Sequence, residues 1–148
     1  VNYLYGTGLA LAALGEAGDA STRGAAERGA GWLAGRRNAD GGWGETCASY
    51  EAPGDATRGR GPSTASQTAW AVLGLLAVRG ADDPSVSAGA DYLVGSQQPG
   101  GDWHEDAYTG TGFPGTFYLR YDLYRLSFPL LALARVLKGA SAPPRAAA

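Results

Sequence analysis

The sequence lacks isoleucine and methionine, holds one cysteine, and has no long apolar or basic run. The single cysteine, Cys47, excludes an internal disulfide framework and fits a reducing compartment. No apolar run approaches the roughly 18–20 residues that span a bilayer. The net charge is −2 with both signs scattered, so no basic block indicates nucleic-acid binding. The 148 residues, 45% of them hydrophobic, suffice for one domain of ordinary size.

Alanine, leucine and glycine are abundant instead. Valine is sparse, and alanine and leucine dominate the apolar segments, a composition that favours helices over strands. Glycine makes up 24 of the 148 residues, far above the usual ~7%. These glycines recur between apolar segments, where turns and helix ends need them. The composition therefore predicts short helices joined by glycine-rich turns.

The chain repeats itself at an offset of 60 residues. RGAGWLAGRRNADGGW (28–43) aligns with AGADYLVGSQQPGGDW (88–103), so that Trp32 falls on Tyr92 and Trp43 on Trp103. A repeat of this length is typical of stacked helical hairpins. Each unit is predicted to consist of an apolar inner helix, a shorter outer helix and a glycine-rich loop that ends in tryptophan. The inner helices are expected over residues 5–18, 67–80 and 127–140, and the outer helices around 25–36 and 86–97.

The second unit carries Tyr92, Gln97 and Trp103 at fixed spacings, and Trp32 and Trp43 hold the matching positions of the first unit. A glutamine at a helix C-terminus can bond carbonyls that lack helical partners, and a tryptophan can cover the next helix end. We interpret these five residues as structural ties between successive units.

The densest aromatic stretch is GTGFPGTFYLRYDLYR, residues 110–125. If Pro114 occupies the first turn of a helix, then Phe117, Tyr121 and Tyr124 share a narrow stripe, and Phe113 lies at its mouth. Most aromatic stripes at helical spacing belong to a core. Several ring faces in a dry cavity would instead attract a cation without offering a lone pair that captures it.

Three segments resemble the squalene–hopene cyclase family of triterpene cyclases, in consecutive order: DGGWGETCASY (40–50), GPSTASQTAWAVLGLL (61–76) and YTGTGFPGTFYLRYDLYRLSFPLLALARV (108–136). The resemblance covers essentially residues 1–136, and STASQTAW favours the bacterial squalene–hopene type over the sterol-forming oxidosqualene cyclases. Arg37 stands where the family has glutamine, and Ala88 where lysine or arginine is usual. Each departure would loosen one structural tie.

The resemblance implies an all-α fold of helical hairpins that form part of an (α/α)6 barrel of the terpenoid cyclase type. It implies cyclisation of squalene or a similar polyprenoid to pentacyclic hopanoids through a proton-initiated carbocation cascade that needs no cofactor. Positions matching Phe113, Phe117, Tyr121 and Tyr124 line the family's cavity where late cations form. Gly112 would keep space there for substrate. Tyr5 matches a tyrosine near the acid end, although a structural helix-end tyrosine is an equal alternative.

The family's catalytic acid belongs to a DxDD motif, and the sequence contains none. The nearest clustered acids, Asp82 and Asp83, precede Pro84 in an expected turn. We therefore expect residues 1–140 to be the C-terminal part of a longer cyclase, inactive alone, followed by a disordered tail over 141–148. Its partners would be the upstream remainder of the enzyme, a membrane surface reached through other parts on the cytoplasmic side, and a second copy in a homodimer.

Two alternatives stay open at this point. One is a non-catalytic helical-repeat module that serves structure or binding. The other is a relative of the protein prenyltransferase β-subunits, which need a zinc site of aspartate, cysteine and histidine. Here Cys47 and His104 occur singly, without a closely spaced partner ligand, so no metal site is predicted.

Overall fold

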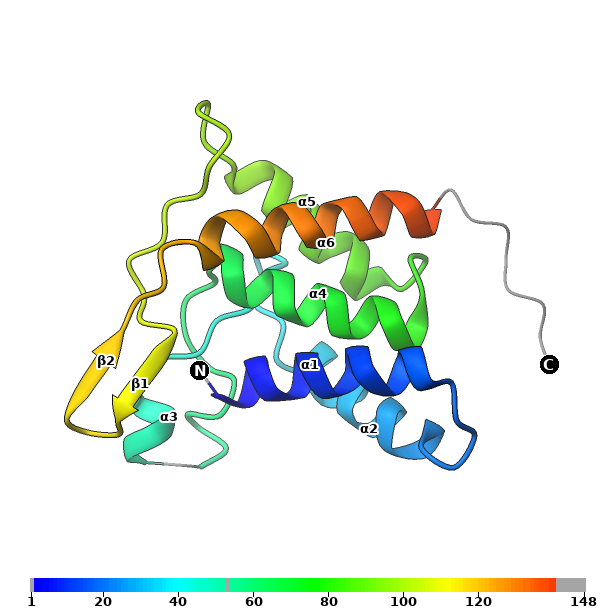
Figure 1. The fold of residues 1–148 in the computed structure, drawn as a ribbon, viewed down its shortest axis with the longest axis horizontal. Coiled ribbons are helices and arrows are strands. Elements are labelled where there is room, and N and C mark those ends of the chain that lie inside the picture. The colour runs from blue at the N-terminus through cyan, green and yellow to red at the C-terminus, as the bar shows by residue number, and fades with distance from the viewer. Residues whose placement is uncertain (1, 53, 141–148) are drawn as a thin grey trace.

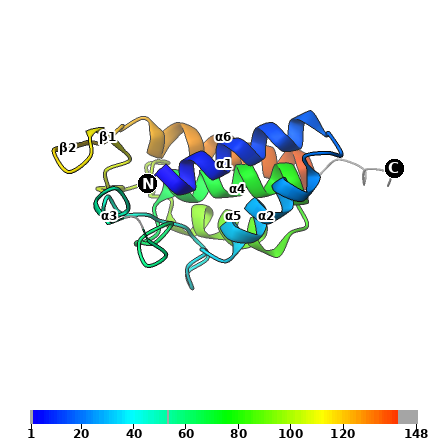
Figure 2. The same cartoon turned by 90° about the horizontal axis from the view of Figure 1, so that it is seen from below.

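The computed structural model describes residues 2–52 and 54–140, so the tail predicted for 141–148 lies outside the described residues. The elements follow in the order α1 (Asn2–Ala17), α2 (Arg23–Ala34), α3 (Ala48–Glu51), α4 (Ala65–Arg79), α5 (Pro84–Ser96), β1 (Gly110–Phe113), β2 (Phe117–Leu119) and α6 (Tyr124–Ala140). Three long helices, α1, α4 and α6, lie side by side and run in the same direction (Figure 1). The shorter α2 and α5 cover one side of this layer (Figure 2).

The two layers match the predicted inner and outer helices. The expectation for 67–80 corresponds to α4, which packs against α1 on one side and α6 on the other. The expectations for 25–36 and 86–97 correspond to α2 and α5. The predicted array of helical hairpins is confirmed, with α4 at its centre because it belongs to the middle repeat.

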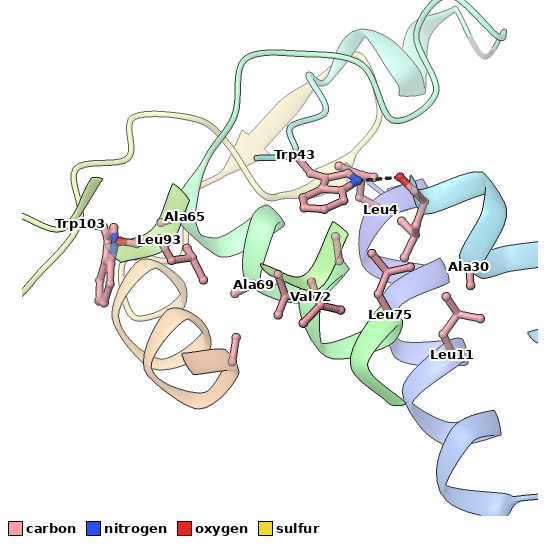
Figure 3. Close-up of a cluster of buried hydrophobic side chains, with 14 of the residues drawn as sticks. Leu4, Leu11, Ala30, Trp43, Ala65, Ala69, Val72, Leu75, Leu93 and Trp103 are labelled. Carbon is pink, nitrogen blue, oxygen red and sulfur yellow. Dashed lines mark hydrogen bonds between the residues drawn. The ribbon is translucent and has the colours of Figure 1, made fainter. Parts of the chain in front are cut away.

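The core lies between the two layers (Figure 3). Its largest side chains are tryptophans, and leucines and alanines fill the space between the helices. The fully or nearly fully buried side chains include Leu4, Leu11, Ala30, Leu33, Trp43, Ala69, Trp70, Val72, Leu75, Leu93 and Trp103. Glycines let α1 approach α4 closely. A Cβ on Gly8 would lie 2.5 Å from the carbonyl oxygen of Trp70, and one on Gly74 would lie 2.9 Å from the carbonyl oxygen of Gly8.

The helix predicted to start at Pro114 is wrong. Residues 110–119 form an antiparallel hairpin, in which Thr111 pairs with Tyr118 and Phe113 with Phe117. Pro114 and Gly115 form its turn: Thr116 N donates to Phe113 O over 3.0 Å, and Gly115 has φ +72°. Proline followed by glycine at positive φ is the pattern of a type II turn. The stripe of Phe117, Tyr121 and Tyr124 along one helix therefore does not exist, because only Tyr124 belongs to α6.

The two tryptophan loops have the same internal bonds. We call residues 36–45 the first Trp loop and 96–105 the second Trp loop. The indole N–H of Trp43 donates to Leu33 O over 2.7 Å, and that of Trp103 donates to Leu93 O over 2.8 Å (Figure 3). Both carbonyls belong to the last turn of an outer helix, where helical partners are missing. The indole, rather than glutamine, therefore bonds the helix end, and Gln97 Nε2 instead donates to Gly101 O within its own loop.

Each Trp loop also supplies a buried glutamate that the sequence interpretation missed. Glu45 Oε2 accepts from Leu4 N over 3.0 Å at the start of α1. Glu105 Oε2 accepts from Ser66 N over 2.9 Å at the start of α4, and its other oxygen accepts from Ser66 Oγ over 2.6 Å. A carboxylate at a helix N-terminus satisfies free N–H groups and complements the helix dipole. The two glutamates are 60 residues apart, so the repeat extends two residues beyond each tryptophan.

Candidate functional site

The N-terminal ends of the three inner helices carry a group of aromatic rings centred on Trp70 of α4. Its indole is 1% exposed. Tyr5 of α1 approaches it with ring centroids 4.8 Å apart, and Tyr124 and Phe128 of α6 approach at 5.8 and 5.6 Å, all edge to face. Such geometry lets the positive edge of one ring meet the negative face of another. Because α4 lies between α1 and α6, Trp70 is where their aromatic residues meet.

Tyr121 extends this group toward the surface. Its ring stacks on that of Tyr124 at 4.8 Å with an interplanar angle of 25°, and its side chain is 45% exposed. A Cβ on Gly110 of β1 would lie 2.7 Å from the Tyr121 ring, so this glycine leaves the room that the ring occupies. Burial raises the pKa of the Tyr124 hydroxyl, which keeps it protonated at neutral pH.

The hairpin carries the two most exposed phenylalanines. Phe113 is 66% and Phe117 is 45% exposed, and their rings meet edge to face at 5.8 Å. The ring of Phe117 lies over the Cα of Gly112, where any Cβ would collide with it. The strand pairing shifts register between Thr111 and Phe113, so Gly112 is an extra residue in β1 that interrupts the regular alternation of side chains. The Tyr121 ring lies against Gly110 and the Phe117 ring against Gly112, two glycines of the same strand.

The predicted site residues therefore divide into two groups. Tyr5, Tyr121 and Tyr124 belong to the group around Trp70, and Phe113 and Phe117 form a separate pair on the hairpin. Among the described residues, no ring-to-ring contact joins the two groups. The space predicted to be kept open by Gly112 is filled by the Phe117 ring. Its role toward a substrate stays a prediction, as do the roles of the aromatic residues.

Sequence reasoning missed Trp70 and Phe128 as parts of this group. Trp70 belongs to the inner helix α4 and is buried there. Its indole N–H has no hydrogen-bond partner among the described residues, and neither has the buried Thr109 hydroxyl. No residue pattern in the sequence pairs α1 with α6 across α4, so only the fold reveals that their aromatics converge.

The buried acids bond the N-terminal ends of two inner helices. Glu45 and Glu105 are 2% and 7% exposed, and both accept hydrogen bonds from helix N-terminal N–H groups. Burial raises the pKa of Glu105, while the bonds from Ser66 oppose that rise by stabilising the carboxylate. The charge of each is directed at a helix end instead of at the aromatic rings.

A groove in the described residues lies elsewhere. It has a volume of about 760 Å³ and is lined by the C-terminal ends of α1, α4 and α6, including Gly15, Leu76 and Lys138. None of the predicted site residues borders it. We place the candidate site at the opposite end, where the aromatic side chains gather, because charged groups such as Arg79, Asp82 and Arg135 dilute the apolar surface of the groove.

Comparison with known proteins settles the family. The family of the squalene–hopene cyclase C-terminal domain matches residues 1–138. The chain belongs to the squalene–hopene cyclase family. It is 47% identical over 135 residues to the squalene–hopene cyclase of Bradyrhizobium diazoefficiens, covering 91% of this chain and 20% of that protein. It is 50% identical over 135 residues to that of Alicyclobacillus acidocaldarius, covering 91% and 21%.

A relative with a different product name is nearly as similar. The dammaradiene synthase of Dryopteris crassirhizoma is 46% identical over 149 residues, covering 91% of this chain and 22% of the synthase. The chain thus spans about a fifth of the length of these relatives. The matching region is their C-terminal domain, and the fold is the helical-hairpin arrangement of terpenoid cyclases. Family membership shows a triterpene cyclase lineage.

Two further features concern the described residues alone. None of their helices combines the length and the apolar character needed to cross a membrane. They also contain no cluster of three or more histidine, cysteine, aspartate or glutamate side chains with the geometry to hold a metal ion.

Proposed function

We propose that this chain is the C-terminal part of an enzyme that cyclises squalene to a pentacyclic hopanoid by a proton-initiated carbocation cascade. The proton donor would lie in a part of the enzyme that this sequence does not include, since the sequence holds no DxDD motif. The chain would supply the aromatic wall along which the late cations pass. Similarity to two squalene–hopene cyclases supports the substrate class.

The observation that carries the proposal is the exposure of Phe113 and Phe117 on the hairpin beside Tyr121. Aromatic side chains that serve a core are buried, as Trp43 and Trp103 are in this molecule. Rings held half-exposed on a short hairpin, with strand glycines making room for them, present their faces to something other than this chain's core. An apolar polyene is a suitable occupant.

The chemistry of a ring face suits a cationic intermediate. Each face attracts a cation by roughly 0.5–2 kcal/mol, and more in a desolvated site. Two such contacts formed only as the cation develops would change a rate by roughly one to three orders of magnitude. A ring has no lone pair that would trap the cation, whereas a water molecule or a free carboxylate would quench it. Phe113, Phe117, Tyr121 and Tyr124 would stabilise late cations in this way.

Tyr5 and Gly112 complete the proposed site. Tyr5 would hold its hydroxyl at the edge of the cavity, with its ring fixed against Trp70. Gly112 would let the Phe117 ring lie flat along β1, so that the ring and not a side chain of the strand meets the substrate. No cofactor takes part in the proposed reaction, because protonation and ring closure conserve the oxidation level.

The enzyme is expected to collect its substrate from a membrane. Squalene dissolves in lipid and not in water, so we propose peripheral association with the cytoplasmic side through parts outside this chain, and assembly of the enzyme as a homodimer. Co-sedimentation of the full-length gene product with lipid vesicles, at two salt concentrations, would test the association.

A substitution in the hairpin tests the proposal. Incubation of the full-length gene product with squalene alone should yield pentacyclic product by gas chromatography and mass spectrometry. Phe117→Leu keeps apolar bulk and removes the ring, so we expect incompletely cyclised products to increase by about tenfold relative to pentacyclic product. Val94→Ala removes an exposed apolar side chain of α5 and serves as the control. An unchanged product ratio in Phe117→Leu would refute the aromatic-wall role.

A further inference from the structure

The aromatic hairpin is fastened to a distant part of the chain by one tyrosine hydroxyl. Tyr118 lies between Phe117 and Leu119 on β2, and it is the one residue of that strand that is half-buried. Side chains alternate along a strand, so Tyr118 points away from the side that carries Phe117. Its hydroxyl donates to Glu51 Oε1 at the end of α3 over 2.5 Å. The two residues are 67 positions apart in the sequence.

The same hydroxyl also holds the turn of the hairpin. Gly115 N donates to Tyr118 Oη over 3.1 Å, so the oxygen accepts from the turn while its proton goes to Glu51. Gly115 has φ +72°, the left-handed conformation on which the Pro114–Gly115 turn depends. One oxygen atom therefore connects the turn that separates Phe113 from Phe117 to a helix of the first repeat.

Two more rings hold Tyr118 in place. Tyr50 of α3 stacks on it with centroids 6.2 Å apart and an interplanar angle of 26°, and Tyr108 lies at 6.3 Å on the chain leading into β1. In Figure 1 the hairpin and α3 lie together at one end of the molecule, beyond the ends of the long helices. The bond to Glu51 raises the pKa of the Tyr118 hydroxyl, so it remains a donor at neutral pH.

We infer that Tyr118 and Glu51 are positioning residues, whose hydrogen bond sets where the Phe113 and Phe117 rings lie against the substrate. The inference rests on the proposed function, because it assigns this pair a task only if the rings meet a cation. A hairpin of two short strands is marginally stable alone. Its rings would otherwise sample several positions, and a cation at the wrong distance from a ring face loses stabilisation.

The experiment separates the hydroxyl from the ring that carries it. In the full-length gene product, Tyr118→Phe keeps the stacking on Tyr50 and removes both the bond to Glu51 and the bond from Gly115 N. We expect incompletely cyclised products to rise about fivefold relative to pentacyclic product, with KM for squalene unchanged. Glu51→Ala should change the product ratio in the same direction, because it removes the acceptor of the Tyr118 proton while the bond from Gly115 N remains. Glu51→Gln keeps an acceptor oxygen and should retain most of the original product ratio.

A double variant and a control variant test whether Tyr118 and Glu51 act through the same hydrogen bond. The double variant of Tyr118→Phe and Glu51→Ala should change the product ratio no more than Tyr118→Phe alone, because that variant has already lost the bond to Glu51. Tyr108→Phe deletes a neighbouring hydroxyl that has no hydrogen-bond partner among the described residues, and it should leave the ratio unchanged. Hydrogen exchange of the hairpin peptide should become faster in Tyr118→Phe, while exchange in α4 stays the same.

The outcomes distinguish this inference from the function on which it rests. If Phe117→Leu changes the product ratio and neither Tyr118→Phe nor Glu51→Ala does, the positioning role is wrong and the aromatic wall stands. If Phe117→Leu also has no effect, both are wrong. A change in Tyr118→Phe that Glu51→Ala does not reproduce would overturn the pairing of these two residues.

Discussion

The first and second Trp loops are built alike but have different surroundings. Asn38 N donates to Gly42 O, and Gln98 N donates to Asp102 O, both over 2.8 Å. Each loop then places an indole on a helix-end carbonyl and a glutamate on the start of an inner helix. The bonds inside a unit therefore repeat with the sequence.

The packing around the two loops does not repeat. Residue 44 of the first Trp loop is a glycine pressed against the backbone of Pro62, and a Cβ on it would collide with the carbonyl of that proline. The corresponding residue of the second Trp loop is His104, whose side chain is 72% exposed. The ring of Trp43 also packs on Gly89 of α5, the outer helix of the next unit. Each repeat unit thus makes its own loop hydrogen bonds, whereas the next unit along the chain packs against the loop and buries it, as in other repeat arrays.

The largest loss of stability is expected at Gly44, where the backbone of Pro62 packs most closely against the first Trp loop. Gly44→Ala would force the strand-like segment around Pro62 away from the loop and strain the bond from Thr64 N to Trp43 O, now 2.9 Å. We expect a loss of about 3 kcal/mol or more in the free energy of local opening, measured by hydrogen exchange at the start of α4. His104→Ala at the matching position should change it by less than about 0.5 kcal/mol. Equal losses in Gly44→Ala and His104→Ala would show that packing of the next segment against the first Trp loop does not contribute to its stability.

A smaller difference in stability is expected between variants that replace the indole of Trp43 and variants that replace the indole of Trp103. Trp43→Phe and Trp103→Phe each leave a carbonyl of an outer helix without its donor, which costs about 1–3 kcal/mol when the group stays buried. Trp43→Phe should cost about 1 kcal/mol more, because the lost ring also packs on Gly89. Hydrogen exchange of the last turns of α2 and α5 measures the two costs in one protein. A larger cost at Trp103 would contradict the comparison.

The sequence repeat made the helical array predictable, whereas the hairpin over residues 110–119 was not predicted. Leucine and alanine at helical spacing predicted α1, α4 and α6 because burying such residues requires little beyond a neighbouring helix. Pro114 misled the prediction, since proline suits both the first turn of a helix and position i+1 of a β-turn. The glycine that follows it, with its positive φ, decides for the turn. The Pro–Gly pair was the available signal for a turn.

The candidate site was predictable residue by residue but not as an arrangement. The chain's resemblance to its family selected Tyr5 and Tyr124, yet their common neighbour Trp70 depends on which sides of α4 the other helices occupy. The bond between Tyr118 and Glu51 joins residues 67 positions apart, and no periodicity connects them. Glu45 and Glu105 could have been predicted as equivalent residues, because the 60-residue repeat continues past each tryptophan.

The smallest expected effect concerns the charge of Glu105. Burial raises its pKa in the folded protein above the value in the unfolded chain, so the folded state holds the proton at pH values where the unfolded state has released it. The contribution of this group to stability therefore grows as pH falls through the raised pKa and is lost as pH rises above it. Glu105→Gln cannot ionise, and its amide can still accept from Ser66 N and donate to Ser66 Oγ.

We expect the free energy of local opening at the start of α4 to increase when the pH is lowered from 7 to 5, and to increase more in the unaltered protein than in Glu105→Gln. Hydrogen exchange, corrected for the intrinsic exchange rate at each pH, measures this free energy. Glu16→Gln neutralises an exposed acid at the far end of α1 and controls for net charge. Glu105→Ala, which removes both acceptors of Ser66, should cost about 1–3 kcal/mol at both pH values. Parallel pH profiles for the unaltered protein and Glu105→Gln would mean that the bonds from Ser66 fully offset the burial of the carboxylate.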